Sequence, residues 1–253
     1  MSRSLGWTAV TVSVRFLGSG SAFCDGGRAH ACIHLTAPGT SLLLDCGGTA
    51  PQAIKRAGVA LASIEAIAVT HFHGDHFGGI PYLIVDQHVT GRTAPLTVAG
   101  PAAIEERVRA ALVALFPDFV DEPIGFPLRF VTLGASPVPL GGALVSAHPV
   151  RHVPATDPHG LRVDVAGTVI AYSGDCSWTA AVPALASGAD LFICEATSFE
   201  TDYVTHLTYR EILSHRAELD CKRIILTHLG WEMLARLGEV RLEYATDDLT
   251  VTV

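Results

Sequence analysis

Apolar and polar positions divide the chain into short segments of strand length and a few longer helical segments. Residues 8–16 alternate in the manner of a strand with one buried face. Residues 64–69 form an apolar run with a single Glu, which predicts a buried strand. The other expected strands are residues 31–35, 41–44, 92–99, 128–133, 143–147, 161–165, 168–172, 191–194 and 223–226.

Helices are expected mainly between the strands of the first half. Residues 51–58 begin with Pro and end with Gly, as short helices do, and the apolar residues 80–89 predict a second helix. A third follows Pro101, because acids occupy its first turns before the apolar residues 108–116. Thr208 and Glu211 have the spacing of a capping box, which predicts a further helix after residue 208.

The order of these elements predicts one α/β layered domain over residues 1–253. No internal repeat, linker or composition break divides the chain. Side chains able to do chemistry follow several strand ends: Asp45, the loop that starts at His71, Asp175, Glu195 and His228. Because functional loops gather along one rim of such a domain, we expect these side chains to meet there.

The composition of the chain indicates which classes of partner the protein disfavours. Apolar residues make up 49% and charged residues 17% of the chain, as in a globular protein. The net charge is −8 and no Lys/Arg cluster is present, so long nucleic acid is an unfavourable partner. The apolar runs are far shorter than a membrane span, and no signal peptide is recognised. Six cysteines without C-x-x-C spacing fit reduced thiols, so we expect a cytoplasmic protein.

Four potential metal ligands lie within six residues in the sequence Thr-His-Phe-His-Gly-Asp-His-Phe-Gly-Gly, residues 70–79. A helix would favour ligands three or four residues apart. His71 and His73 are instead spaced for extended backbone, where alternate side chains share one side. Asp75 and His76 then point in another direction. We therefore expect two adjacent metal ions rather than one.

This H-x-H-x-D-H run, followed by a later His, an Asp after a strand and a final His, resembles the metallo-β-lactamase superfamily. The resemblance covers nearly the whole chain and implies a four-layer αβ/βα sandwich, in which two mixed sheets face each other with helices outside. It implies that one metal is bound by His71, His73 and His152, the second by Asp75, His76 and His228, and that Asp175 bridges the two.

His148 is the alternative to His152 as the third-motif ligand. We prefer His152 because His152-Val-Pro-Ala and Gly160-Leu-Arg162 resemble the H-x-x-P and G-x-R run of ribonuclease Z-like members. His and Asp ligands suit zinc, manganese or iron, and zinc is the expected metal.

Several stretches are similar to the ribonuclease Z and phosphodiesterase branch of the superfamily. Cys194-Glu195-Ala-Thr is similar to its H-E-A-T loop, with Cys in place of the first His, and His206-Leu-Thr208 is similar to its H-x-T loop. In that branch the loop His, oriented by the Glu, assists phosphodiester cleavage. The alternative is that Glu195 and His206 form a structural pair at the neighbouring helix.

The chain departs from ribonuclease Z proper in one respect. That enzyme holds tRNA with a long arm between the third-motif His and the bridging Asp, whereas His152 and Asp175 leave room only for a two-strand connection. We therefore expect a phosphodiesterase acting on small phosphodiesters, with a hydroxide shared by two metals as nucleophile and Asp75 orienting it. The alternatives are a lactonase or thioesterase-type acyl hydrolase, a tRNA 3′-processing endonuclease, and a metal-binding scaffold. A homodimer is a family-level expectation.

Overall fold

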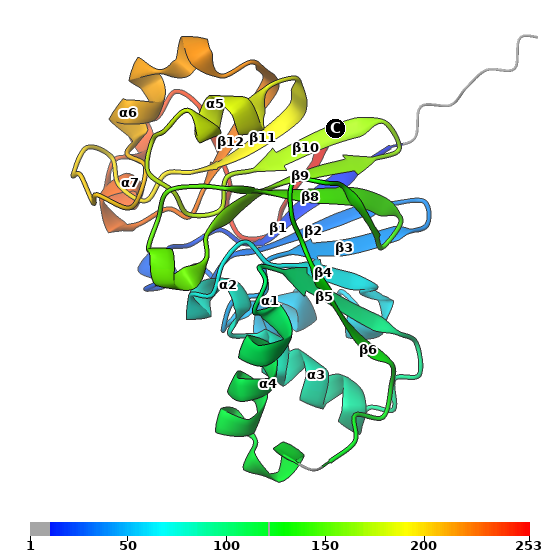
Figure 1. Cartoon of the computed structure of the whole chain (residues 1–253). Helices are drawn as coiled ribbons and strands as arrows, with labels where there is room; N and C mark the ends of the chain where they lie inside the picture. Colours follow the sequence, from blue (N-terminus) through cyan, green and yellow to red (C-terminus); the bar gives the residue numbers. More distant parts are fainter. Residues whose placement is uncertain (1–10, 121) are drawn as a thin grey trace, which may run out of the picture.

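Two seven-stranded sheets face each other, and helices cover the outer side of each (Figure 1). The structure is a computed structural model and describes residues 11–120 and 122–253. In the first sheet the strand order is β14 (Leu249–Thr252), β1 (Ser13–Gly18), β2 (Cys32–Ala37), β3 (Thr40–Leu44), β4 (Ala66–Ala68), β5 (Leu96–Gly100) and β6 (Leu128–Thr132). In the second it is β13 (Glu243–Tyr244), β12 (Cys221–Thr227), β11 (Ala189–Glu195), β10 (Thr168–Tyr172), β9 (His159–Val165), β8 (Ala143–Pro149) and β7 (Val138–Leu140).

Among the described residues, four α-helices accompany the first sheet and three the second. The first group is α1 (Ala50–Arg56), α2 (Gly74–Phe77), α3 (Ile80–Val89) and α4 (Ile104–Leu115); the second is α5 (Ala181–Ala186), α6 (Tyr209–Ser214) and α7 (Trp231–Ala235). Both sheets are mixed, since β3 to β6 and β10 to β13 run parallel while the other neighbours are antiparallel. The four-layer arrangement expected from the sequence is confirmed.

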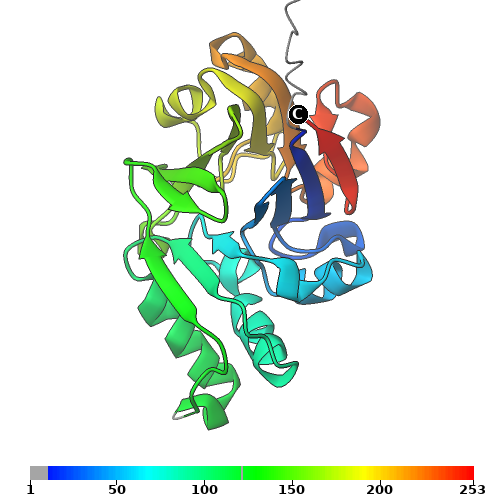
Figure 2. The ribbon, with the colours of Figure 1, turned by 90° about the vertical axis from the view of Figure 1, so that its right-hand side faces the viewer.

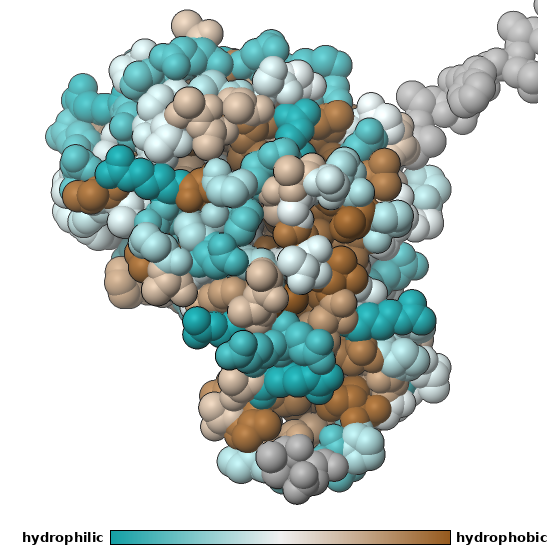
Figure 3. Space-filling view, in the orientation of Figure 1, coloured by the Kyte–Doolittle hydropathy of each residue, from teal (hydrophilic) through white to brown (hydrophobic). Residues whose placement is uncertain are grey.

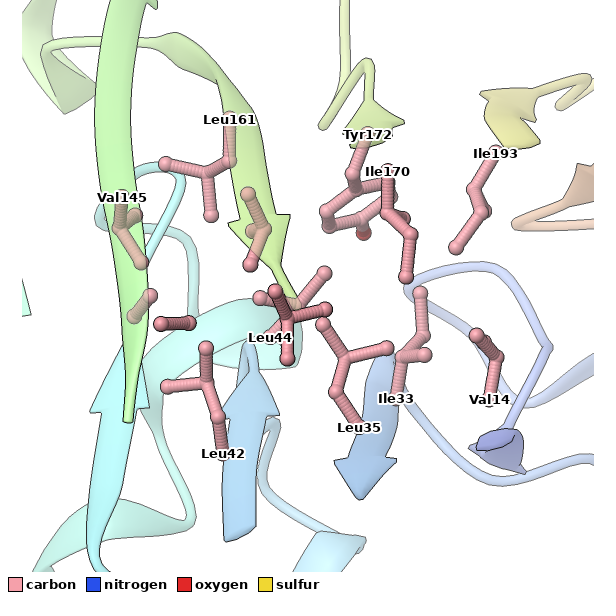
Figure 4. Packing of buried hydrophobic residues seen from close by; sticks show 14 of the residues in the cluster. Val14, Ile33, Leu35, Leu42, Leu44, Val145, Leu161, Ile170, Tyr172 and Ile193 are labelled. Carbon is pink, nitrogen blue, oxygen red and sulfur yellow. The ribbon is translucent and has the colours of Figure 1, made fainter. Parts of the chain in front are cut away.

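The main core lies between the two sheets. Alternate residues of each strand point inward, so Leu42 and Leu44 from β3 face Val145, Leu161 and their neighbours across the interface (Figure 4). The residues drawn there are almost completely buried. Each such Leu or Val side chain contributes about 1.5–3 kcal/mol by leaving water. Two further apolar clusters lie between the sheets and their outer helices.

The predicted strands and helices differ from the structure mostly at their ends. The first strand starts at residue 13 rather than 8, and residues 8–10 lie outside the described part. The sequence analysis missed β7, β13 and β14 and the short helices α2, α5 and α7. These elements have two to six residues, too few to establish a period, and their backbone is paired or packed by tertiary neighbours.

The end of the first sheet that contains β5 and β6 extends downward with helices α3 and α4 as a lobe of the molecule (Figure 2). Hydrophobic residues are visible among polar ones over this lobe (Figure 3). Tyr82, Val89 and Leu115 of its helices are exposed. No helix within residues 11–120 and 122–253 is both long enough and apolar enough to pass through a bilayer.

Candidate metal centre

The candidate ligands meet at one edge of the sandwich because each follows the carboxyl end of a strand. His71 follows β4 and His152 follows β8, while Asp175 follows β10 and His228 follows β12. Parallel strands bring their carboxyl ends to the same edge, and the two sheets place these edges face to face. The sequence therefore delivers ligands from both halves of the chain to one place.

Two groups of potential ligand atoms form there, each with all of its atoms within 4.8 Å of one another. The first is His71, His73, His152 and Asp175, and the second is Asp75, His76, Asp175 and His228. Asp175 belongs to both groups. Its Oδ1 atom lies 3.2 Å from His76 Nε2, and its Oδ2 atom lies 3.4 Å from His228 Nε2. The structure thus brings together the side chains that the resemblance implies for each ligand set.

Two atoms of these groups have no hydrogen-bond partner among the described residues, although both are fully buried: His76 Nε2 and Asp175 Oδ1. A buried polar atom without a partner costs free energy. A cation between them would accept both lone pairs. The donor set, imidazole nitrogens and carboxylate oxygens at close range, therefore fits a divalent metal ion.

The side chains of the two groups differ in how the site shifts their pKa values. Burial, together with the neighbouring His76, holds the pKa of His71 well below its usual value, so its ring is neutral and can ligate. Burial alone would raise the pKa of Asp175, but the positive charges of His228 and His76 in the metal-free protein outweigh it and hold this pKa well below its usual value. The carboxylates of the second group in turn outweigh burial and raise the pKa of His76 and His228, so a metal ion would bind these rings by displacing a proton from each. The site thus presents an ionised carboxylate in a protected position.

Asp45 supports the site from behind, as expected from its position after β3. Its Oδ2 atom lies 2.7 Å from His76 Nδ1, and its Oδ1 atom accepts a hydrogen bond of 2.8 Å from the Thr70 N–H. Because a carboxylate can only accept here, His76 carries its proton on Nδ1 and directs Nε2 to the site. His152 is fixed similarly, since its Nδ1 donates to the Thr205 carbonyl over 2.7 Å.

Asp45 and His228 adopt left-handed backbone conformations, with φ of 58° and 57°. Such a conformation costs a non-glycine residue on the order of 1 kcal/mol or more. Both residues are buried at the site. The packing of the sandwich therefore maintains strained backbone at Asp45 and His228, the two positions where it fixes these side chains at the site.

Glu195 and His206 form a close pair beside these groups. His206 Nδ1 lies 3.0 Å from Glu195 Oε1, and the Cys176 N–H donates to the same oxygen over 2.7 Å. Burial disfavours a charged His206, but the Glu195 carboxylate outweighs it and raises the pKa of His206 to about 9. The pairing with Glu195 therefore favours the imidazolium form of His206 in the metal-free protein.

Glu195, His206 and His228 also form a third group of close ligand atoms. Here, however, the Thr197 hydroxyl lies between the three side chains, 2.6 Å from Glu195 Oε2 and 3.0 Å from His228 Nδ1. The Glu195 carboxylate and the Nδ1 atoms of His206 and His228 are hydrogen-bonded here, whereas each of the other two groups includes Asp175, whose buried Oδ1 atom has no partner among the described residues.

A pocket of about 410 Å³ opens next to His206 and His228. Three aromatic side chains line it: Phe23, which is 88% exposed, Trp231, which is 62% exposed, and Tyr203. The sequence analysis missed these three residues, and it quoted Thr197 only as the last residue of the stretch similar to the H-E-A-T loop, without a role. The three aromatic residues come from separate loops and carry no joint signal in the sequence.

The remaining histidines lie outside the two ligand groups. His148 Nε2 lies 3.0 Å from Ser146 Oγ, and His159 Nδ1 lies 2.9 Å from the Asp157 carbonyl. His34 is buried against Ser41, and His215 stacks on Trp178. His152, rather than His148, is thus the histidine beside His73.

The whole chain resembles known metallo-β-lactamase fold proteins. The ribonuclease Z of Methanothermobacter thermautotrophicus is 30% identical, over 95% of this chain and 93% of the relative. The metallo-β-lactamase fold protein YhfI from Bacillus subtilis superposes with a TM-score of 0.79 at 19% identity, covering 96% of this chain and 100% of YhfI. A diphosphatase of the PhnP family superposes with a TM-score of 0.74 at 21% identity, covering 95% and 97%.

The superfamily resemblance expected from the motifs is confirmed by these relatives, and the two solved structures establish the fold. The profile of the family described as Anti-Pycsar protein Apyc1 matches residues 12–241. The chain therefore belongs to the Anti-Pycsar protein Apyc1 family and is a metal-dependent hydrolase related to ribonuclease Z within the metallo-β-lactamase superfamily.

Proposed function

We propose that the protein is a phosphodiesterase acting on small phosphodiesters. The observation that carries this proposal is the Glu195–His206 pair, which lies between the two ligand groups and the pocket of about 410 Å³. A protonated His206 that lines the pocket is suited to giving a proton to a departing oxygen. An acyl hydrolase has less need of this group, because the metal site alone can activate a carbonyl.

In this proposal two metal ions are held by the two ligand groups. His71, His73 and His152 would bind one ion, Asp75, His76 and His228 the other, and Asp175 both. Zinc is the proposed metal, and manganese or iron would suit the same donors. When bound, such ions acidify water and stabilise the negative charge that develops on phosphoryl oxygens.

The chain's own residues supply proton control and substrate placement. Asp75, whose Oδ2 atom lies 3.1 Å from His228 Nε2, would orient the attacking water by accepting a hydrogen bond from it. His206 donates its Nδ1–H to Glu195, which leaves Nε2–H for the leaving oxygen. Phe23 and Trp231 would contact the organic group attached to that oxygen.

The negative charge of the protein and the short segment between His152 and Asp175 favour a small substrate over tRNA. Between His152 and Asp175 the chain forms only a short 3-10 turn, Pro154–Thr156, and the hairpin of β9 and β10. The pocket also receives carboxylates from Asp25 and Glu232, and the net charge of the chain is −8. A polyanion would be repelled by such a surface. The ribonuclease Z relatives keep tRNA 3′-processing as the second candidate.

Incubating the zinc-loaded protein with bis(p-nitrophenyl) phosphate, a lactone and a precursor tRNA in parallel tests the proposal. We expect turnover of the phosphodiester and little of the other two. Faster hydrolysis of the lactone, or accurate 3′ cleavage of the tRNA at similar efficiency, would contradict it.

Two further features belong to this proposal. All six cysteines are free, which supports a reducing compartment such as the cytoplasm. The exposed apolar side chains Tyr82, Val89 and Leu115 support a homodimer. Light scattering of the purified protein would measure its mass in solution, and a monomer at micromolar concentration would contradict the dimer.

A further inference from the structure

The Thr197 hydroxyl joins the Glu195–His206 pair to a candidate metal ligand. Its oxygen lies 2.6 Å from Glu195 Oε2, 3.1 Å from His206 Nδ1 and 3.0 Å from His228 Nδ1. Glu195 is fully buried at the end of β11, and His228 is buried after β12. A single half-buried side chain thus touches three groups that the proposed function uses.

The available protons determine the direction of each hydrogen bond that Thr197 makes. A hydroxyl has one proton to donate and two lone pairs to accept with. The Glu195 carboxylate can only accept, and its contact is the shortest, so the hydroxyl proton of Thr197 points to Glu195. The Thr197 oxygen must then accept from His228, which requires a proton on His228 Nδ1.

This assignment fixes the other nitrogen of the His228 ring. With the proton on Nδ1, the lone pair of a neutral His228 is on Nε2, which lies 3.1 Å from Asp75 Oδ2 and 3.4 Å from Asp175 Oδ2. That is the side where the second ligand group is gathered. The same hydroxyl restrains the Glu195 carboxylate, whose other oxygen receives the proton of His206 Nδ1.

We propose that Thr197 is a positioning residue that sets the ring tautomer of His228 and, through Glu195, the direction of His206. The inference rests on the proposed function, because it takes His228 as a metal ligand and His206 as the proton donor. It predicts that one hydroxyl affects both metal affinity and the dependence of the rate on the leaving group. A threonine that only fills space would affect neither in this way.

The test compares Thr197→Val and Thr197→Ala, which lack the hydroxyl, with Thr197→Ser, which keeps it. Thr97→Val, at a half-buried threonine on β5, is the matched control. Zinc affinity is measured by competition with a chromophoric chelator. Rates are measured on bis(p-nitrophenyl) phosphate, whose leaving group departs without a proton, and on diphenyl phosphate, whose phenolate needs one. Thermal unfolding shows which variants fold.

We expect both hydroxyl-free variants to bind one zinc ion about 10–100-fold more weakly, while Thr197→Ser and Thr97→Val bind like the unchanged protein. We also expect the hydroxyl-free variants to lose more activity on diphenyl phosphate than on the nitrophenyl ester. The inference is overturned if Thr197→Ala and Thr197→Val bind zinc as tightly as Thr197→Ser, or if both esters slow equally. An unchanged protein that cleaves neither ester would instead refute the proposed function, and the zinc measurements would still decide the role of Thr197.

Discussion

His76 Nδ1 lies 2.7 Å from Asp45 Oδ2, and neither side chain reaches solvent. The contact joins the end of β3 to α2 and leaves His76 Nε2 facing Asp75 and Asp175. Replacing Asp45 by Asn keeps the volume but removes the charge that orients the ring. We expect Asp45→Asn to weaken zinc binding about 10–100-fold, measured by chelator competition. Asp248→Asn, at an exposed carboxylate that pairs with Arg15, is the control, and equal affinities of the two variants would contradict this role.

His71→Ala should remove metal binding and activity together. His71 is buried, and its Nε2 atom lies 3.1 Å from His73 Nδ1 in the first ligand group. We expect the total zinc content of His71→Ala, measured by elemental analysis, to fall well below that of the unchanged protein. We also expect no turnover of bis(p-nitrophenyl) phosphate above background. His88→Ala, at a histidine that accepts from the Gly125 N–H far from the site, should bind zinc normally. Near-normal turnover by His71→Ala would refute the assignment of the metal centre.

His206→Ala should keep its metals but react slowly. Loss of a proton donor in the transition state costs about 10²–10⁴-fold in rate. We expect kcat on diphenyl phosphate to fall within this range, while zinc content stays unchanged. The matched control is His215→Ala, which removes a ring stacked on Trp178. If His206→Ala loses zinc, His206 is a ligand and its assignment as proton donor is wrong.

Trp231→Ala should weaken the binding of aromatic substrates. The indole is 62% exposed and lines the pocket beside His206. Aromatic contacts contribute about 0.5–1.5 kcal/mol, so we expect KM for bis(p-nitrophenyl) phosphate to rise roughly 2–10-fold with little change in kcat. Tyr82→Ala removes an exposed aromatic ring from α3 and serves as the control. An unchanged KM in Trp231→Ala would exclude the indole from substrate binding.

Acid should destabilise the metal-free protein partly through His34. Burial, with a smaller effect of the Arg15 charge, lowers the pKa of His34 to about 4. The unfolded chain takes up this proton near pH 6.5, whereas the folded chain resists it. His34 therefore leaves the free energy of unfolding unaffected above pH 6.5. As the pH falls from 6.5 toward 4, it lowers this free energy by about 3 kcal/mol at most.

Urea unfolding of the protein, with its metal removed by a chelator, measures the free energy of unfolding between pH 7 and pH 4. His34→Gln can keep a hydrogen bond to Ser41 but cannot be protonated, so the free energy of its unfolding should fall less over this range. Parallel pH profiles for the variant and the unchanged protein would contradict the prediction.

The candidate metal ligands could be recognised in the sequence because their signals are local. His71, His73, Asp75 and His76 lie within six residues, and each later ligand follows an apolar strand. Asp45 was recognisable for the same reason. The pairing of Glu195 with His206 came from the resemblance of two short loops, and the structure places their side chains 3.0 Å apart.

The rest of the site depends on tertiary placement. Thr197 lies in a loop, where a hydroxyl is common, and only the approach of β11 to β12 brings it to His228. Phe23 and Trp231 line one pocket although more than two hundred residues separate them in the chain. The two loops meet where Asp25 accepts a hydrogen bond from the backbone N–H of Trp231. No periodicity in either loop reports such a contact. Strand β14 was missed because its partner, β1, is equally distant in sequence.

The pairing of β14 with β1 has a consequence for synthesis on the ribosome. Residues 13–16 emerge early, yet the edge of β1 is covered only when residues 249–252 have been made. Until then a nascent chain exposes an unpaired strand that could join another chain. Cellular yield should therefore depend on how quickly this last strand is captured. Stalled chains released before residue 249 should aggregate or recruit chaperones, even though all of the proposed metal ligands have already been synthesised.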